Sequence, residues 1–206
     1  MLARAGRPFL LTVGVADAVV AEAYYFYRIP VILVGVVALS ALFVLFLQFF
    51  RDPERRPAGG IVAAADGRIL LIEKEGRNVR IGTFMNVTNV HVNRIPYPGY
   101  LVRVDDRQGK KRPAFSPKAS GNAQKRYLCG TPIGVVEVVQ ITGLIARRCV
   151  AYKRAGSILS RGDRLGMVLF GSRVDVVLPA DRVKVLVHIG DGVHANSTAI
   201  AEPLPW

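Results

Sequence analysis

Two apolar stretches at the start of the chain predict helices. Residues 29–50 form a nearly unbroken hydrophobic run. About 20 such residues cross a hydrocarbon core of ~30 Å, so this run predicts a transmembrane helix. Residues 8–27 are also apolar but contain Asp17 and Glu22. We expect a second span that forms a hairpin with the first, with an interfacial or buried helix as the alternative. The sequence therefore predicts one or two transmembrane helices within residues 1–50.

From Gly59 onward the pattern changes to short β-branched runs punctuated by Gly, Pro and Asp-Gly pairs. These runs predict strands within residues 61–73, 78–85, 87–94, 100–104, 134–145, 167–178 and 183–190. The fold class is therefore mainly β, a sandwich-like or barrel-like domain behind the helices. Two segments, 156–162 and 190–196, resemble the exposed hairpins of biotinyl and lipoyl carrier modules. Asn196 stands where the first segment has its second Gly, because Asn also tolerates positive φ.

Charge is distributed unevenly between these parts. The chain is 51% apolar and carries a net charge of +13; residues 1–50 hold three Arg against two acids, so the rest carries 13 − 1 = +12. Arginines before the first apolar stretch and after the second favour a cytoplasmic location for both ends. We therefore expect the protein in the cell membrane, with its β domain on the cytoplasmic face, where anionic lipid attracts basic surfaces.

Composition also narrows the classes of function. High hydrophobicity excludes a disordered basic tail, and only 8% of residues are aromatic, which disfavours a stacking-based nucleic-acid reader. We expect no nucleic-acid partner. Cys129 and Cys149 are too few for a disulfide framework and predict reduced thiols. The most polar segment, residues 103–126, includes eight Lys or Arg. It predicts a mobile, solvated loop, with phosphate or membrane-surface contact as the functional alternative.

Three residue types suited to nucleophilic chemistry stand out in the predicted β domain. Strand alternation places His91 on one face with Asn89 and Asn93, which indicates water or a site. Asp66, in an Asp-Gly pair, is by default a hairpin-turn residue. Ser172 follows a glycine inside an apolar run, by default a bulge. Together they supply an orienting carboxylate, a general base and a hydroxyl nucleophile.

Other sequence signals of catalysis or metal binding are weak or absent. The chain has no GxSxG elbow of the hydrolase type. His188 lies in a short apolar run and His194 on a predicted turn. No His or carboxylate spacing matches a metal site, so none is expected.

Several segments in colinear order resemble one family. They are FFRDPER at residues 49–55, AADG around Asp66, FMNVTNVHVNRIP around His91, QITGLIARR at 140–148 and RGDRLGMVLFGSRVDVVLP at 161–179. From about residue 49 to the C-terminus the chain is similar to the short, membrane-associated phosphatidylserine decarboxylases. It differs from longer members in having a single histidine near position 91, and FGSR where many carry LGST.

The resemblance implies a proenzyme that cuts itself between Gly171 and Ser172. The Ser172 hydroxyl would attack the preceding carbonyl, with His91 removing the proton and Asp66 orienting the imidazole. The expected products are a β chain of residues 1–171 and an α chain of residues 172–206, which stay associated. Residue 172 would become a covalent pyruvoyl group, the family's cofactor. His91 could serve self-cleavage, decarboxylation or both.

The implied activity is decarboxylation of a serine phospholipid to its ethanolamine product. Phosphatidylserine and its ether-linked archaeal analogue, archaetidylserine, are equally compatible as substrates. We expect residues 1–50 to be the anchor and 51–206 the catalytic domain; a homo-oligomer is compatible with the sequence. The alternatives are a non-enzymatic, membrane-anchored adaptor of the biotinyl-lipoyl type and a pyruvoyl decarboxylase of a soluble amino acid.

Overall fold

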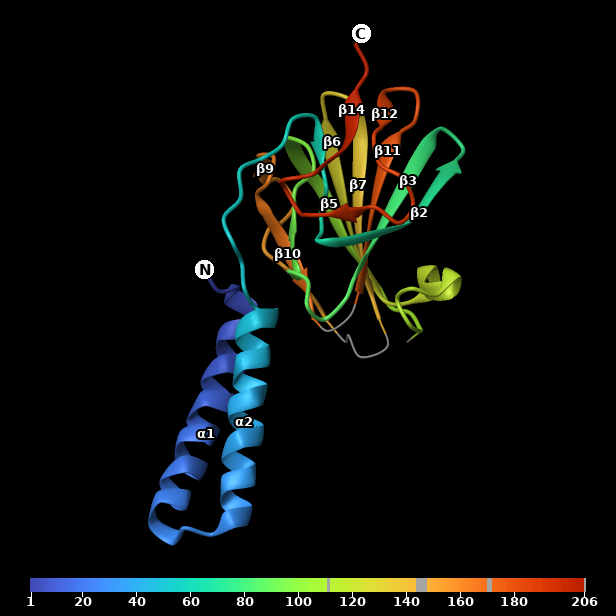
Figure 1. The fold of residues 1–206 in the computed structure, drawn as a ribbon. Helices are drawn as coiled ribbons and strands as arrows, with labels where there is room; N and C mark the ends of the chain where they lie inside the picture. Colours follow the sequence, from blue (N-terminus) through green and yellow to red (C-terminus); the bar gives the residue numbers. More distant parts are fainter. Residues whose placement is uncertain (111, 144–147, 170–171, 206) are drawn as a thin grey trace. The chain divides into compact units, whose positions relative to one another are not determined.

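The computed structural model describes residues 1–110, 112–143, 148–169 and 172–205. The chain divides into two compact units, Met1–Glu54 and Arg55–Trp206. The first is helical and the second is built of β-strands (Figure 1). Each is described by itself.

The N-terminal unit is a helical hairpin. A short 3-10 turn, η1 (Arg4–Gly6), leads into α1 (Arg7–Tyr27), and α2 (Pro30–Phe49) returns antiparallel to it. Pro30 can begin α2 because the first turn of a helix needs no amide donor. Both helices are long and apolar enough to cross a membrane. The expectation of a second apolar helix is confirmed.

Polar and aromatic contacts hold the two helices of this unit together. Ser40 of α2 donates a hydrogen bond of 2.8 Å to the Asp17 carboxylate of α1. An acid within an apolar helix is costly unless a neighbouring helix supplies a partner. Near the other end of the hairpin, Phe9 stacks on Phe50 with ring centroids 5.5 Å apart. The Ser40 contact gives one oxygen of the Asp17 carboxylate a partner on the neighbouring helix.

The β unit is centred on an antiparallel sheet of eight strands in the order β13-β2-β3-β11-β7-β6-β5-β9. Its strands, in chain order, are β2 (Gly67–Glu75), β3 (Asn78–Met85), β5 (Gly99–Arg107), β6 (Gln124–Thr131), β7 (Gly134–Thr142), β9 (Ile158–Leu159), β11 (Ser172–Pro179) and β13 (Gly192–Val193). The sheet curls into a half-barrel, and β11 lies in its middle between β3 and β7.

Two three-stranded sheets complete the β unit. One has the order β4-β10-β8 and the other β1-β14-β12. Their strands are β1 (Ile61–Val62), β4 (Val92–Arg94), β8 (Cys149–Ala151), β10 (Arg164–Val168), β12 (Val183–Val185) and β14 (Ala199–Pro203).

The sheet β4-β10-β8 covers the inner face of the large sheet. A Cβ added to Gly166 of β10 would lie 2.9 Å from the Tyr127 hydroxyl and 3.2 Å from Nε2 of Gln140. Glycine is therefore required at this close approach. Alternate residues of β11, among them Val174 and Val176, join the large apolar core between the sheets. The β-barrel-like class predicted from the sequence is confirmed.

The predicted strand regions contain strands in the structure, but several of these strands are shorter than predicted or divided. The run 78–85 matches β3, whereas 61–73 and 167–178 are each divided between two strands of different sheets. In the run 87–94 only Val92–Arg94 forms a strand. Asp66 precedes β2 and lies outside the β2–β3 hairpin turn, so its default assignment to a hairpin turn was wrong.

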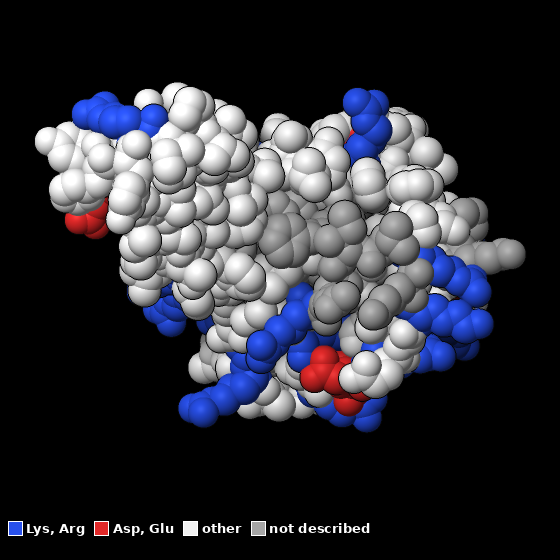
Figure 2. Space-filling model, turned by 90° about the horizontal axis from the view of Figure 1, so that it is seen from below, with Lys and Arg blue, Asp and Glu red and all other residues white. Residues whose placement is uncertain are grey.

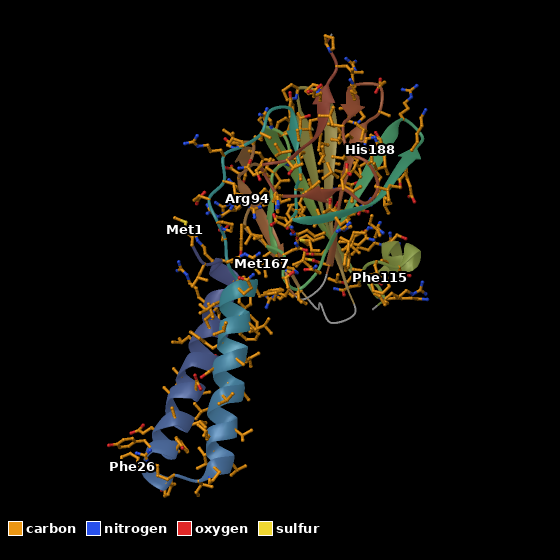
Figure 3. The ribbon with its side chains drawn as sticks, in the orientation of Figure 1. Met1, Phe26, Arg94, Phe115, Met167 and His188 are labelled. Carbon is orange, nitrogen blue, oxygen red and sulfur yellow. The ribbon has the colours of Figure 1, made fainter. Side chains whose placement is uncertain are left out.

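The prediction of a solvated loop over residues 103–126 was wrong at both ends. Strand β5 continues to Arg107 and β6 begins at Gln124, because the two strands pair through their charged residues. Between them lies η2 (Pro117–Gly121), in which Ala119 is fully buried. Just before η2, Phe115 contacts Phe84 edge to face at 6.0 Å, beside the sheet (Figure 3). This connection therefore covers part of the outer face of the sheet.

The two predicted glycine-bounded segments do turn through the left-handed region. Gly156, Gly162 and Gly190 have φ values of 83°, 80° and 97°, and Asn196 has φ 69°. The positive φ expected at Asn196 is confirmed. A Cβ on Gly162 would come within 2.3 Å of the Asn196 side chain, so the two segments meet at their ends.

Candidate active site

Ser172 is the first residue of β11, at the end of the strand where polar residues gather. It lies opposite Met85 of β3 on one side and Thr142 of β7 on the other. The residue is fully buried, and within the part of the chain that the structure describes its hydroxyl has no hydrogen-bond partner. Gly171, the other residue of the expected cleavage site, lies outside the described residues. Ser172 thus carries a buried hydroxyl, and its backbone is paired with a strand on each side.

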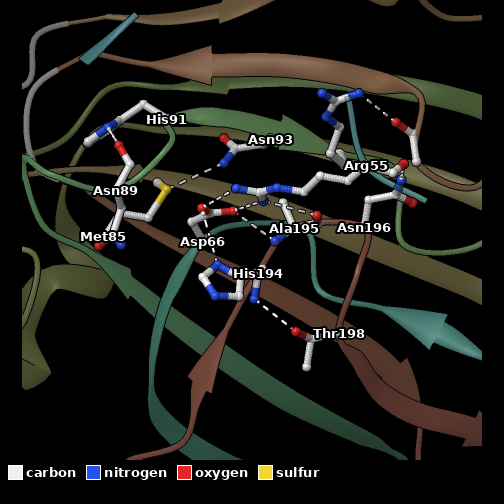
Figure 4. A network of polar contacts seen from close by, with 12 residues as sticks. Arg55, Asp66, Met85, Asn89, His91, Asn93, His194, Ala195, Asn196 and Thr198 are labelled. Atoms are coloured by element: carbon white, nitrogen blue, oxygen red, sulfur yellow. Dashed lines mark hydrogen bonds and ion pairs between the residues drawn. The ribbon is translucent and has the colours of Figure 1, made fainter. Parts of the chain in front are cut away.

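His91 lies in the connection between β3 and β4 and is also fully buried. Its Nδ1 is 2.9 Å from the carbonyl oxygen of Asn89 (Figure 4). A carbonyl only accepts, so Nδ1 carries the proton and donates it. In a neutral imidazole this leaves Nε2 as the basic nitrogen. His91 is therefore set up as a base at Nε2.

Backbone hydrogen bonds join the segment before Asp66 to the segment after His91. Val62 donates to the carbonyl of Pro96 and Arg94 donates to the carbonyl of Ala64. These two bonds run the segments antiparallel, and the chain then bends at residues 64–66.

The side chain of Asp66, however, has other partners. It accepts two hydrogen bonds from the guanidinium of Arg55 and one from the amide of Ala195, and its Oδ2 lies 3.6 Å from Nδ1 of His194 (Figure 4). Burial by itself would raise the pKa of Asp66, but these hydrogen bonds and the charges of Arg55 and His194 outweigh it, so the pKa is lowered. Asp66 is an ionised, buried carboxylate.

A chain of buried amides connects the His91 segment to the large sheet. Asn93 accepts a hydrogen bond of 2.7 Å from Gln140, and Gln140 accepts one of 3.0 Å from the Tyr127 hydroxyl. Asn93 also donates to the sulfur of Met85 at 3.6 Å (Figure 4). Because Met85 faces Ser172 across β3 and β11, these contacts fix the segment carrying His91 at the same end of the sheet as Ser172.

The sequence identified part of this arrangement. The polar strand face of Asn89, His91 and Asn93 was expected to border water or a site; His91 and Asn93 are buried, Asn89 is partly exposed, and only Asn93 lies in a strand. The roles of Arg55, Gln140 and Tyr127 were missed, because their partners are distant in sequence. Alternation along β7 could have signalled Gln140, a polar residue on the same face as buried Val138.

The remaining histidines differ in placement. His194 joins the Asp66 contacts, with a side chain 69% exposed. His188 projects at the surface of the β unit, with an 89% exposed side chain (Figure 3). Among the described residues no group of three His, Cys, Asp or Glu is placed to hold a metal. Both cysteines are free, and burial raises the pKa of each thiol to about 12.

The chain is similar to known proteins over most of its length. The family model described as phosphatidylserine decarboxylase matches residues 42–201. The chain is 44% identical, over 191 residues, to a Halobacterium salinarum protein provisionally named an archaetidylserine decarboxylase proenzyme; the match covers 85% of this chain and 94% of that protein. Phosphatidylserine decarboxylase proenzymes of Cupriavidus taiwanensis and Streptomyces griseus are 40% and 38% identical, covering 98% and 97% of this chain and 95% and 92% of theirs.

These matches define the class as decarboxylases that are made as proenzymes. The chain belongs to the phosphatidylserine decarboxylase family, as the resemblance in its sequence indicated. It is therefore an enzyme, a carbon–carbon lyase of phospholipid metabolism.

Proposed function

We propose that this chain cuts itself between Gly171 and Ser172 and then decarboxylates a serine phospholipid, either phosphatidylserine or archaetidylserine. The observation that carries the proposal is the buried Ser172 hydroxyl, which has no hydrogen-bond partner among the described residues. A polar group in that state costs about 1–3 kcal/mol. Such a cost calls for a functional explanation.

Self-cleavage assigns the Ser172 hydroxyl a reaction. Its oxygen attacks the Gly171 carbonyl carbon, the C–N bond breaks, and an ester with a free Ser172 amine forms. Removal of the Ser172 α-proton then expels the Gly171 carboxylate and leaves an enamine. Water converts this to a ketone with loss of ammonia, so a pyruvoyl group ends the new chain. His91 acts as the base for the first proton through Nε2, whose basicity follows from the Nδ1 contact with Asn89.

The position of residue 172 suits a covalent group that must remain in place after the cut. A pyruvoyl group supplies a ketone that bonds the substrate amine and takes up the electron pair left by departing CO₂. Strand β11 is held between β3 and β7 over its length, so residues 172–206 stay bound to residues 1–171. Burial at this end of the strand limits the access of bulk water to the reacting atoms. We assign the return of a proton to His91, the buried histidine at this end of the sheet.

Asp66 has a supporting part in this proposal. Its carboxylate connects the segments of Arg55 and Ala195. The residues just before Asp66 hydrogen-bond to Arg94 and Pro96, which follow His91 in the chain. Asp66 thereby supports the backbone that carries His91.

The apolar hairpin gives the enzyme access to its substrate. A diacyl or diether phospholipid stays in the bilayer, so the enzyme must work at headgroup depth. Two helices of spanning length provide the anchor. The positive charge of residues 51–206 favours the cytoplasmic, anionic face, and the anionic serine lipid over its zwitterionic product.

The experiment is to purify the full chain in detergent and measure its intact mass and CO₂ release. We expect two chains, 1–171 and 172–206, and CO₂ from vesicles containing serine phospholipid. Ser172→Ala is expected to stay uncut and inactive, while Ser160→Ala, which alters an exposed serine, should behave like the parent. A single uncut parent chain would favour an adaptor; equal turnover of free serine would favour a soluble-substrate decarboxylase.

A further inference from the structure

A polar cleft of about 470 Å³ opens in the β unit where strands β5, β6 and β7 meet β8. Its lining comes from the end of β5, the start of β6, the end of β7 and the β8 segment. Its lining includes the charged residues Asp106, Arg107, Lys125 and Arg148 and the hydroxyl-bearing Thr142.

Strand register connects this cleft to Ser172. Ser172 lies directly opposite Thr142, and directly opposed residues of paired strands point to the same face. Two residues earlier on β7, Gln140 lies opposite Lys125 of β6. Ser172, Thr142, Gln140 and Lys125 therefore share the inner face of the sheet. Thr142, which lines the cleft, therefore lies directly beside Ser172, the proposed reaction centre.

The cleft has an excess of positive charge, from one buried cation and two exposed ones. The Lys125 side chain is only 10% exposed and pairs with Asp106 at 2.5 Å, whereas Asp106 is 66% exposed. Arg107 and Arg148 line the same cleft and are exposed. Among the lining residues named here, Lys125, Arg107 and Arg148 are cationic and Asp106 is anionic. Figure 2 shows Lys and Arg side chains gathered on this end of the β unit, with a small acidic group among them.

We propose that this cleft binds the phosphodiester of the lipid headgroup, with Lys125 and Arg148 as its principal contacts. The inference rests on the proposed function, because it takes the substrate amine to react at position 172. Four covalent bonds separate that amine from the phosphorus atom. Strand β6 lies two strands from β11, roughly 10 Å away. The headgroup and the flexible lysine stem together span this distance.

The chemistry favours the phosphate over the carboxylate of serine. A cation paired with the carboxylate stabilises the charge that must be lost with CO₂, so it would slow decarboxylation. The phosphodiester keeps its charge throughout the reaction. Cations on that group bind substrate and transition state alike and so lower KM with little effect on kcat. The ethanolamine product retains the phosphodiester and should compete for the same cleft.

The test uses the purified, self-cleaved enzyme, a short-chain serine phospholipid in detergent micelles, and glycerophosphoethanolamine as a soluble competitor. Lys125→Gln and Arg148→Gln should each raise KM about tenfold or more, with kcat changed by less than about twofold. Calorimetry should show glycerophosphoethanolamine binding weakened by the same factor. Lys125→Arg should restore part of the affinity. Lys184→Gln, which removes an exposed lysine of β12, is the matched control and should change neither value.

The outcomes separate this inference from the proposed function. Complete self-cleavage and CO₂ release, with KM and competitor binding unchanged in both Lys125→Gln and Arg148→Gln, would overturn the phosphate assignment alone. If Lys125→Gln does not fold, the exposed Arg148 still decides the matter. Inorganic phosphate that competes as well as the diester would identify a general anion site and also overturn the headgroup assignment. Failure of the parent to self-cleave would instead count against the proposed function.

Discussion

The Arg55 guanidinium and the Asp66 carboxylate form a bidentate ion pair. The segment just before Asp66 hydrogen-bonds to Arg94, in the segment that follows His91. Both carboxylate oxygens of Asp66 accept from the guanidinium, with the NH2–Oδ2 bond at 2.8 Å. The Asp66 side chain is 4% exposed and that of Arg55 22%. Asp66 also accepts from the Ala195 amide, and Asn196 donates to the Arg55 carbonyl. One carboxylate thus connects its own segment to Arg55, 11 residues away, and to Ala195, 129 residues away.

This pair predicts a specific loss of stability in acid. The pKa of Asp66 is lowered in the folded chain, so its ionised form stabilises the fold. That contribution is fully present above the unfolded pKa of about 3.9 and is lost as pH falls through the lower folded value. Asp66→Asn should lower the free energy of unfolding by about 3 kcal/mol at pH 7, since it removes the buried carboxylate charge that faces the Arg55 guanidinium.

Denaturant unfolding of Asp66→Asn and the parent from pH 7 to pH 3 checks this. The difference between the two should shrink as pH falls below about 4. Asp181→Asn, at a 75% exposed carboxylate, is the control and should stay within about 0.5 kcal/mol of the parent. A difference that is constant across this range would show that the Asp66 charge does not stabilise the fold. We also expect Asp66→Asn to slow self-cleavage.

His91 is predicted to control the rate of self-cleavage. His91→Ala removes the proposed base and should slow the appearance of the 172–206 chain by about 10²–10⁴-fold. Pulse-labelled synthesis followed by denaturing gels measures this rate. His188→Ala removes a histidine that is 89% exposed and should cleave at the parental rate. Cleavage of His91→Ala at the parental rate would assign the base to another group.

The sequence was most informative where the pattern is local. Strand β3 follows from alternation and a Gly-containing turn within residues 75–78, and the helices follow from length and hydropathy alone. It was least informative where a contact spans the chain. Asp66 and Ala195 are 129 residues apart, and nothing in either segment indicates the other. Strand β6 was missed because its polar start resembles a loop until the pairing of Lys125 with Asp106 is known.

The buried amide chain behind His91 is predicted to maintain the arrangement of the site. Gln140→Met keeps the volume but leaves the Asn93 oxygen and the Tyr127 hydroxyl without the partners they have now. It should cost about 2–4 kcal/mol, whereas Tyr127→Phe, which removes one terminal hydroxyl, should cost about 1 kcal/mol. Denaturant unfolding of the uncut Ser172→Ala background measures both. Equal costs would show that the hydrogen bond between Gln140 and Asn93 adds nothing to the stability of the fold.

Charged side chains on the outer face of β11 form a buried ion-pair network. Arg173, next to Ser172, donates to Asp175 through Nε at 2.6 Å and NH2 at 2.7 Å, and Arg80 donates to the same carboxylate at 3.1 Å. Arg173 and Asp175 are buried, with side chains 3% and 0% exposed. Arg80 also pairs with Glu75, whose side chain is 43% exposed. One buried acid therefore balances the buried arginine that follows the proposed cleavage site.

Asp175→Asn should destabilise the uncut chain by about 3–5 kcal/mol, because it leaves the buried charge of Arg173 uncompensated. Glu75→Gln removes the outer carboxylate of the same network and should cost less than about 1 kcal/mol. Thermal unfolding at neutral pH compares the two in the Ser172→Ala background. If Asp175→Asn is no more costly than Glu75→Gln, the buried pair does not hold β11. If it is costly, its effect on the cleavage rate in the Ser172-containing chain should be larger than that of Glu75→Gln, since Arg173 adjoins the attacking residue.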